Sequence, residues 1–223
     1  MSERRDAGAA AAAVGDAAAQ VRAYGRRVTP APRGLYGAWK RAADAVIAGT
    51  LCLGLAPILA LVALMVVLDS PGPALFRQRR SGRGGHEFTM LKFRTMKLGT
   101  PDLASHLMGD GRDRITRIGR FLRRTSLDEL PQLWNVLVGD MALVGPRPAL
   151  YNQDDLIAMR QAAGVDALRP GVTGWAQVNG RDEIPMAEKV RLDREYLERV
   201  GVLMDAEVLV RTVTVLFTGR GVN

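Results

Sequence analysis

A long uncharged segment, from Ala45 to Leu68, limits what this chain can fold into more than any other part of its sequence. A helix that crosses a bilayer needs about 20 consecutive apolar residues, and this segment is long enough. The alternative is a buried helix of a soluble domain, which the uncharged length disfavours. The sequence therefore predicts a helix that enters a membrane.

The surroundings of this segment argue against a simple crossing. Pro57 lies near its middle, where the missing backbone N–H bends a helix. Basic residues stand on both sides: Arg22, Arg26, Arg27, Arg33, Lys40 and Arg41 before it, and Arg77, Arg79, Arg80 and Arg83 after it. Lys and Arg collect on the cytoplasmic side of a membrane. We therefore predict a re-entrant membrane helix over residues 36–70, broken at Pro57, that enters and leaves on the same side.

Two further parts flank this helix. Residues 1–35 are rich in Ala, Gly and Arg without a durable apolar face, and are predicted to form a mobile tail. Residues 71–223 are enough for one folded domain. Its fold class is predicted as α/β in the broad sense, a mainly helical α+β arrangement with a small β-hairpin.

The hairpin is predicted between Pro71 and Met96, where two apolar arms surround the turn-forming residues 81–85. Its second arm ends in Lys92 and Arg94, which share one face of a strand. A solvated edge and an anion-binding edge are both compatible with this pair. Helices are predicted over 114–124, which is basic and amphipathic, and over 186–200 and 202–217 at the end of the chain.

The composition limits which ligands and which metal sites this chain can have. The formal net charge of +8 predicts a polyanionic partner, whether nucleic acid, anionic lipid or a phosphorylated metabolite. The single cysteine, Cys52, excludes an intrachain disulfide and a multi-cysteine metal site. His86 and His106 lack the spacing of zinc ligands. There is no P-loop and no Gly-x-Ser-x-Gly elbow, and no nucleic-acid reader motif accompanies the basic helix.

The strongest candidate for chemistry is the segment 125–132, Thr-Ser-Leu-Asp-Glu-Leu-Pro-Gln. Ser126 and Glu129 have the spacing of a capping box, which predicts that Asp128 and Glu129 occupy the first turn of a helix. The helix dipole there favours charged carboxylates, and such a carboxylate acts as a nucleophile or a metal ligand. Ordinary helix-start residues are the common alternative. Pro131 predicts that this helix is bent there or that its first turn is irregular.

Two later loops present arginines on stiff backbone. Arg147 stands between Pro146 and Pro148, which hold it on an extended chain. The glycine-rich loop from Arg169 to Arg181 carries Gln177 and is predicted either to shape a pocket for a phosphorylated ligand or to be an ordinary surface loop.

Taken in order, these motifs resemble the monotopic phosphoglycosyl transferases, bacterial sugar transferases that start glycan assembly on polyprenyl phosphate. The resemblance covers about residues 38–223. Its motifs are the apolar segment with a central proline, Lys92–Met96, Arg123–Gln132, Gly139–Met141, Val144–Pro148, Arg169–Arg181, and Leu192-Asp193 with Tyr196. One departure is Ala56 before Pro57, where the family often has serine.

The resemblance implies a reaction at phosphorus. Asp128 would attack the sugar-bearing phosphate of a UDP-sugar and release UMP, and the phosphosugar–aspartyl intermediate would pass to undecaprenyl phosphate. Glu129 would hold Mg²⁺. The residues expected to bind substrate are Lys92, Arg94, Arg123, Arg147, Arg169, Gln177, Arg181 and Asp193.

The resemblance also implies a place in the cell. The protein would sit on the cytoplasmic face of the inner membrane, in contact with lipid and without a nucleic-acid partner, and would start a capsule, exopolysaccharide, O-antigen or glycoprotein glycan. The sugar and a homo-oligomeric state are left open.

Two rival functions fit part of the sequence. A non-enzymatic, membrane-anchored basic protein that binds anionic lipid or nucleic acid explains the charge, but not the paired carboxylates or the proline-framed arginines. A glycosidase also uses two carboxylates. Adjacent helical residues diverge by roughly 100°, however, so Asp128 and Glu129 are badly placed to flank a sugar ring.

Overall fold

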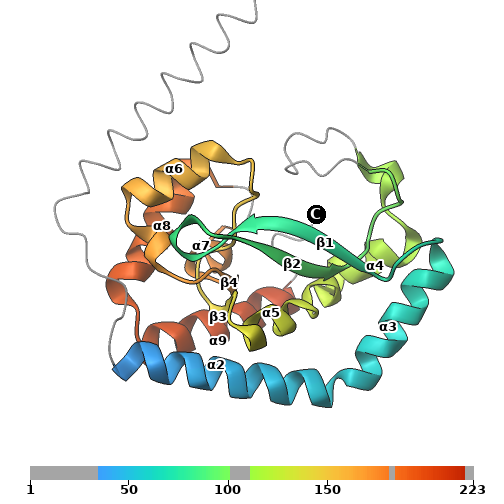
Figure 1. Ribbon diagram of the computed structural model, residues 1–223, viewed down its shortest axis with the longest axis horizontal. Coiled ribbons are helices and arrows are strands. Elements are labelled where there is room, and N and C mark those ends of the chain that lie inside the picture. Colours follow the sequence, from blue (N-terminus) through green and yellow to red (C-terminus); the bar gives the residue numbers. More distant parts are fainter. Residues whose placement is uncertain (1–34, 101–110, 181–183, 219–223) are drawn as a thin grey trace, which may run out of the picture.

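The computed structural model describes residues 35–100, 111–180 and 184–218 (Figure 1). The predicted tail and Arg181 lie outside these residues. The described chain mixes helices with two small sheets, which confirms the mainly helical α+β class.

Two helices form one long border of the molecule. Helix α2 spans Leu35–Gly54 and helix α3 spans Ala56–Asp69, and they meet at an angle of 63° (Figure 1). Pro57 lies in the first turn of α3, where its missing N–H breaks no bond within that helix. The predicted break is therefore confirmed. No single described helix is long and apolar enough to cross a membrane, but this bent pair is when taken together; the re-entrant placement stays a prediction.

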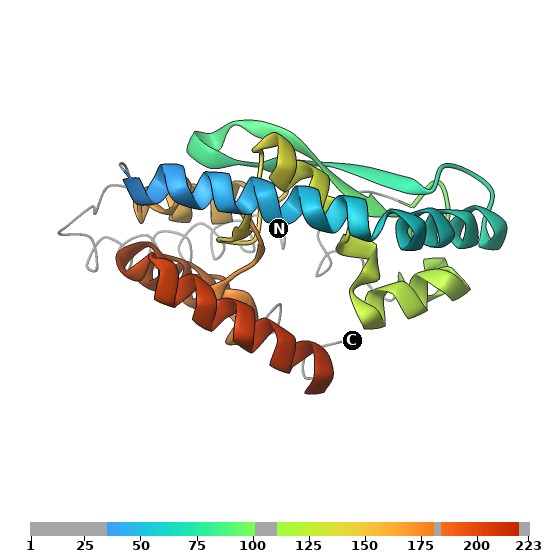
Figure 2. The ribbon, with the colours of Figure 1, turned by 90° about the horizontal axis from the view of Figure 1, so that it is seen from below.

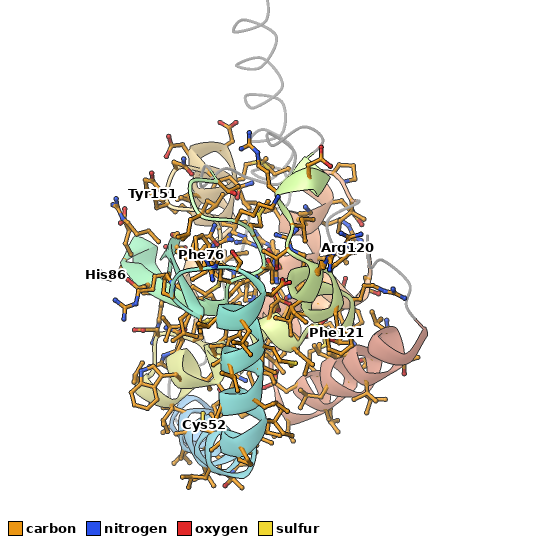
Figure 3. All side chains as sticks on the ribbon, turned by 90° about the vertical axis from the view of Figure 1, so that its right-hand side faces the viewer. Cys52, Phe76, His86, Arg120, Phe121 and Tyr151 are labelled. Carbon is orange, nitrogen blue, oxygen red and sulfur yellow. The ribbon has the colours of Figure 1, made fainter. Side chains whose placement is uncertain are left out.

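The predicted hairpin is also confirmed. Strand β1 (Leu75–Ser81) pairs antiparallel with β2 (Glu87–Phe93), so that Leu75 faces Phe93 and Ser81 faces Glu87. The turn contains the short 3-10 helix η1 (Arg83–Gly85), in which Gly84 and Gly85 have positive φ angles that few other residues adopt. His86 lies at the outer edge of the molecule, beside this turn (Figure 3).

Helix α5 (Gln132–Val138) lies between the hairpin and α2. Its buried residues Leu133 and Val136 pack with Met90 of β2 and Ala48 of α2. The Asn135 side chain accepts a hydrogen bond from the Leu91 amide and donates one to the Thr89 carbonyl, at 3.0 and 2.8 Å. Trp134 of the same helix is 55% exposed and is not part of this packed cluster.

The basic amphipathic helix is α4 (Arg117–Thr125), which follows the short 3-10 helix η3 (Gly111–Arg114). Leu122 is fully buried against Val62, Val66 and Phe93, whereas Phe121 is 51% exposed. Arg120 and Phe121 both lie on the side of the molecule that is seen in Figure 3.

The remaining helices and strands pack together into a second part of the hydrophobic core. Strands β3 (Ala142–Val144) and β4 (Gly171–Thr173) pair in parallel. They are surrounded by α6 (Asp154–Ala162), the 3-10 helix η5 (Val165–Ala167), α7 (Trp175–Val178), α8 (Met186–Arg199) and α9 (Val202–Thr218). The last two helices agree with their predicted ranges, but the sequence did not indicate the parallel strand pair.

A half-buried polar cluster joins this body to the start of α2. Asp205 of α9 accepts hydrogen bonds from Tyr36 at 3.0 Å, from Lys40 at 2.6 Å and from Tyr196 at 2.6 Å. Helix α9 therefore begins beside the N-terminal end of α2, and the two helices diverge from there (Figure 2).

Candidate active site

Asp128 and Glu129 lie in a one-turn 3-10 helix, η4 (Leu127–Glu129), and the capping box predicted for them is wrong. Ser126 makes no side-chain capping bond and has a left-handed conformation, with φ 56° and ψ 16°. A capping residue needs extended backbone for its side chain to reach the amides ahead of it. Ser126 instead closes α4, where its amide donates to the Arg123 carbonyl at 3.3 Å. Pro131 was predicted to bend this helix or to make its first turn irregular, and helix α5 instead begins only after it, at Gln132.

Glu129 is fixed by two cations that come from other parts of the chain. Its Oε1 accepts a hydrogen bond from Lys92 Nζ at 2.7 Å and one from an Arg147 terminal nitrogen at 3.0 Å. Lys92 stands near the end of β2, and Arg147 in the proline-framed loop after β3. The predicted residues Lys92, Arg147 and Glu129 therefore do meet in one cluster.

Electrostatics keep Glu129 ionised. Burial alone would raise the pKa of the Glu129 carboxyl, but the charges and hydrogen bonds of Arg147 and Lys92 hold it well below its usual range. Burial lowers the pKa of the Lys92 ammonium, and attraction to Glu129 opposes that change. The cluster is thus a charged triad in which each partner stabilises the charge of another.

Asp128 has a different environment. Only 9% of the residue is exposed, and no hydrogen bond to its carboxylate comes from any residue that the structure describes. Burial raises the pKa of the Asp128 carboxyl; Lys92, Arg123 and Arg147 work against this rise, and Glu129 adds to it. An oxygen that is surrounded by cations but not tied by hydrogen bonds is available to react with an incoming phosphorus.

Arg123 approaches this carboxylate from α4. Its Nε donates to Thr95 Oγ1 at 2.9 Å, and burial lowers the pKa of its guanidinium while Asp128 raises it. The contact depends on Gly119, because a Cβ at that position would overlap the Thr95 backbone. Glycine therefore lets α4 lie close enough to place Arg123 near Asp128.

Arg160, which no sequence motif had indicated, holds the Arg147 loop in place. Arg160 donates to the Arg147 carbonyl at 2.6 Å, and its other nitrogens donate to Asp193 Oδ2 at 3.0 and 2.6 Å. Asp193 is only 1% exposed. A buried carboxylate requires a cationic partner, so Asp193 was a signal that such a residue exists, although not that it is Arg160. Asp193 thus reaches the site through Arg160.

Other residues predicted to bind substrate form their hydrogen bonds away from Asp128 and Glu129. Arg94 donates to the carbonyls of Ser70 and Pro71 at the end of α3, at 2.5 and 2.6 Å. Arg169 donates to the Gly139 carbonyl at 3.1 Å, beyond the far end of α5, and Gln177 donates to the Val172 carbonyl at 3.1 Å. None of these bonds involves the carboxylate pair, and a role of these residues in substrate binding stays a prediction.

The donor set agrees with Mg²⁺ only in the presence of a phosphate ligand. Among the described residues, no three His, Cys, Asp or Glu side chains gather closely enough to hold a metal ion by themselves. Mg²⁺ commonly takes one or two protein carboxylates together with substrate phosphates and water. Both bonds to Glu129 fall on Oε1, so Oε2 and the Asp128 oxygens are the candidate donors.

Fixed Lys and Arg side chains like those around this carboxylate pair stabilise the charge of transferring phosphoryl groups in enzymes. Residues 35–219 match the sequence profile of the bacterial sugar transferases. The chain belongs to this family.

Relatives in the family are named for several sugars. A UDP-glucose:undecaprenyl-phosphate glucose-1-phosphate transferase of Caulobacter vibrioides is 45% identical over 198 residues, which cover 85% of this chain and 73% of the relative. The Escherichia coli K12 protein of the same name is 42% identical over 181 residues, 78% of this chain and 39% of its own. A UDP-N-acetylgalactosamine-undecaprenyl-phosphate N-acetylgalactosaminephosphotransferase of Aeromonas hydrophila is 33% identical over 196 residues, 85% of this chain and 46% of its own. The chain therefore spans less than half the length of the last two.

Proposed function

We propose that this protein transfers a sugar 1-phosphate from a UDP-sugar to undecaprenyl phosphate and releases UMP. The names of its relatives support this reaction class. The single observation that carries the proposal is Asp128, a buried carboxylate that receives no hydrogen bond from the described residues and lies beside Lys92, Arg123 and Arg147. That environment suits a carboxylate that attacks an anionic diphosphate, because the cations offset the repulsion between the two.

The reaction would take two steps at one phosphorus atom. In the first, an Asp128 oxygen attacks the sugar-bearing phosphorus; an O–P bond forms, and the bond to UMP breaks with its electron pair on UMP. In the second, a phosphate oxygen of undecaprenyl phosphate attacks the same phosphorus and Asp128 leaves as a carboxylate. The sugar keeps its anomeric C–O bond throughout. Dividing the transfer in this way lets both substrates use one set of cations in turn.

Glu129 has a supporting role in this proposal. Its Oε2 and Asp128 would hold Mg²⁺ together with the donor phosphates, and the ion would withdraw negative charge from them. The bonds from Lys92 and Arg147 to Oε1 orient the Glu129 carboxylate. Arg147 is held in turn by Arg160 through its own carbonyl.

The bent pair of α2 and α3 supports a re-entrant position in the membrane. Both neighbouring basic clusters would then stay at the cytoplasmic surface, where anionic lipid attracts each charge by roughly 1 kcal/mol. UDP-sugars are made on that side, and the acceptor cannot leave the lipid. The product would start a capsule, exopolysaccharide, O-antigen or glycoprotein glycan.

The test is a donor panel. Purified protein is incubated with undecaprenyl phosphate, Mg²⁺ and UDP-glucose, UDP-galactose or UDP-N-acetylgalactosamine, and UMP release is measured. We expect UMP with at least one donor, no UMP from Asp128→Asn, and unchanged release from Asp155→Asn, the same change at an exposed position on α6. Absence of UMP with every donor would favour the non-enzymatic lipid-binding alternative.

A further inference from the structure

A cavity of about 420 Å³ lies between the N-terminal half of α2 and the β3–β4 region. Its charged lining consists of Lys40, Arg41, Asp44, Arg83 and Arg169. These residues come from α2, from the hairpin turn and from the loop before β4. Four cations and one carboxylate therefore line a cavity large enough for a small ligand.

This cavity is separate from the carboxylate pair. Arg41 donates to the carbonyls of Val136 and Leu137 at 2.8 and 2.7 Å, and Arg169 donates to that of Gly139, so both stand at the C-terminal end of α5. Glu129 lies before the other end of this helix, whose seven residues rise roughly 10 Å. None of the cations that contact Asp128 or Glu129 lines the cavity.

Two of the arginines are held so that part of each guanidinium remains available. Arg83 Nε donates to the Ala167 carbonyl at 2.9 Å, and Arg169 Nε donates to the Gly139 carbonyl at 3.1 Å. Within the described ranges, no hydrogen bond involves the terminal nitrogens of either side chain. The bond at Nε orients the guanidinium, and the two terminal nitrogens remain as a pair of parallel donors that can bind phosphate oxygens.

The cations repel one another in the absence of a ligand. Burial lowers the pKa of the Arg169 guanidinium, and the charges of Arg83 and Arg41 lower it further. Lys40 Nζ lies 3.5 Å from Asp44, the single lining carboxylate, and 2.6 Å from Asp205, so these two carboxylates offset part of this charge. A bound anion would relieve the remaining repulsion.

A purely structural role explains only part of the cluster. Cations at the C-terminal end of a helix satisfy its last carbonyls and its dipole, which accounts for Arg41 and Arg169 at the end of α5. Arg83 reaches the cavity from the exposed hairpin turn, and its Nε donates to the last carbonyl of η5, that of Ala167, which leaves its terminal nitrogens unexplained by this bond. Its presence opposite the other cations is what a ligand site requires.

We propose that this cavity binds a phosphate-bearing anion, either the headgroup of an anionic lipid or a soluble phosphate compound. The chemistry of recognition is the same for both: paired N–H groups of Arg83 and Arg169 around phosphate oxygens, with Lys40 and Arg41 supplying further charge. The site does not depend on catalysis at Asp128.

Two substitutions test the site without touching the arginines that cap α5. Arg83→Gln removes one charge from an exposed turn, and Arg77→Gln on exposed β1 of the same hairpin is its matched control. Ala38→Glu places a carboxylate in the lining, at an exposed position of α2, and Ala38→Gln is the uncharged control. All four variants are expected to fold.

Binding of a phosphate-bearing ligand to the whole chain is measured in two arms. One arm compares phosphatidylcholine nanodiscs with and without phosphatidylglycerol. Native mass spectrometry then counts the phosphatidylglycerol molecules that stay bound to the protein. The other titrates pyrophosphate into protein in neutral detergent by calorimetry. We expect saturable binding in at least one arm, weakened about tenfold by Arg83→Gln and by Ala38→Glu, the loss expected for one charge-assisted contact. The two control variants should bind like the original protein.

The arms distinguish the source of the phosphate. Retention of phosphatidylglycerol alone identifies a lipid headgroup, and pyrophosphate binding identifies a soluble ligand. The proposal is overturned if neither probe binds, or if Arg83→Gln and Ala38→Glu bind as well as their controls. Because binding is read without any sugar nucleotide, failure here leaves the transferase proposal untouched.

Discussion

Ser126 is the one non-glycine residue with a positive φ among the described residues, and it stands two positions before Asp128. A left-handed conformation costs an L-residue roughly 1–2 kcal/mol, and such strain is concentrated at functional sites. Here it lets α4 end and η4 begin within a single residue. Arg123, on the last turn of α4, and Asp128 are thereby brought onto neighbouring turns.

The environment of Asp128 predicts how the reaction depends on pH. The proposed nucleophile reacts when it is deprotonated, so the rate should rise as pH rises through its pKa. Burial raises that pKa, and Lys92 is the cation that opposes this most. Removing the charge in Lys92→Met should therefore raise the pKa of Asp128 further, and the acid limb of kcat/KM for UMP release should move to higher pH.

Lys92→Arg is the control for this shift, because it keeps the positive charge. Its acid limb should stay near that of the original protein, even if kcat falls because the geometry has changed. An acid limb that does not move in Lys92→Met would mean that Asp128 is not the group whose ionisation limits the reaction.

Asp193 is expected to act as a positioning residue. Asp193→Asn leaves Arg160 without its buried partner, which should lower the free energy of unfolding by about 3 kcal/mol. It should also lower kcat by loosening the Arg147 carbonyl from Arg160. Thermal unfolding and UMP release measure the two effects.

A double-mutant cycle separates this positioning role from simple loss of stability. Asp193→Asn combined with Arg160→Met removes both charges and should recover part of the lost stability. The kcat should stay low, because the hydrogen bond to the Arg147 carbonyl is still missing. Recovery of both quantities together would show that Asp193 affects turnover only through stability.

At the scale of elements, the bend between α2 and α3 predicts a topology. If the pair is re-entrant, the start of α2 and the hairpin turn lie on the same side of the membrane. Leu35 is 93% exposed and His86 is also exposed. Cysteines at these two positions, in a Cys52→Ala background, should both resist an impermeant thiol reagent in intact cells and react once the membrane is opened.

The single cysteines of this experiment report independently on the start of α2 and on the hairpin turn that follows α3. Cys52 lies within α2 and is replaced so that each variant carries one thiol (Figure 3). Labelling from outside at position 35 but not at 86 would mean that the segment crosses the bilayer, and the re-entrant prediction would be wrong.

For the molecule as a whole, the sequence predicted the features that depend on local chemistry. Two apolar arms around a turn-forming cluster predicted the hairpin, Pro57 predicted the helix break, and Pro131 predicted an irregularity near the start of α5. The parallel pair β3–β4 was not predictable from such patterns. Its strands have three residues each, too short to show a period, and depend on close approach of glycine backbone: a Cβ at Gly171 would overlap Gly145.

The sequence predicted which residues form the candidate active site, but not which of them contact one another. Asp128, Glu129, Lys92 and Arg147 were all expected, yet Lys92 and Arg147 reach Glu129 from 37 and 18 residues away. Local spacing contains no information about such pairings. The same reason explains why Arg160 was missed, since its partner Asp193 is 33 residues away. Resemblance to a family identified the motifs, and the fold determined which of them meet.

The central claim is that Asp128 is a covalent nucleophile, and one measurement tests it most directly. The protein is mixed with an accepted UDP-sugar and no lipid acceptor, and is then analysed by intact-protein and peptide mass spectrometry while UMP is measured. We predict that UMP appears without the acceptor, and that a sugar-phosphate adduct is found on the peptide that contains Asp128 and is absent from Asp128→Asn. Release of UMP only when undecaprenyl phosphate is present, with no adduct on any peptide, would contradict the account and indicate direct transfer.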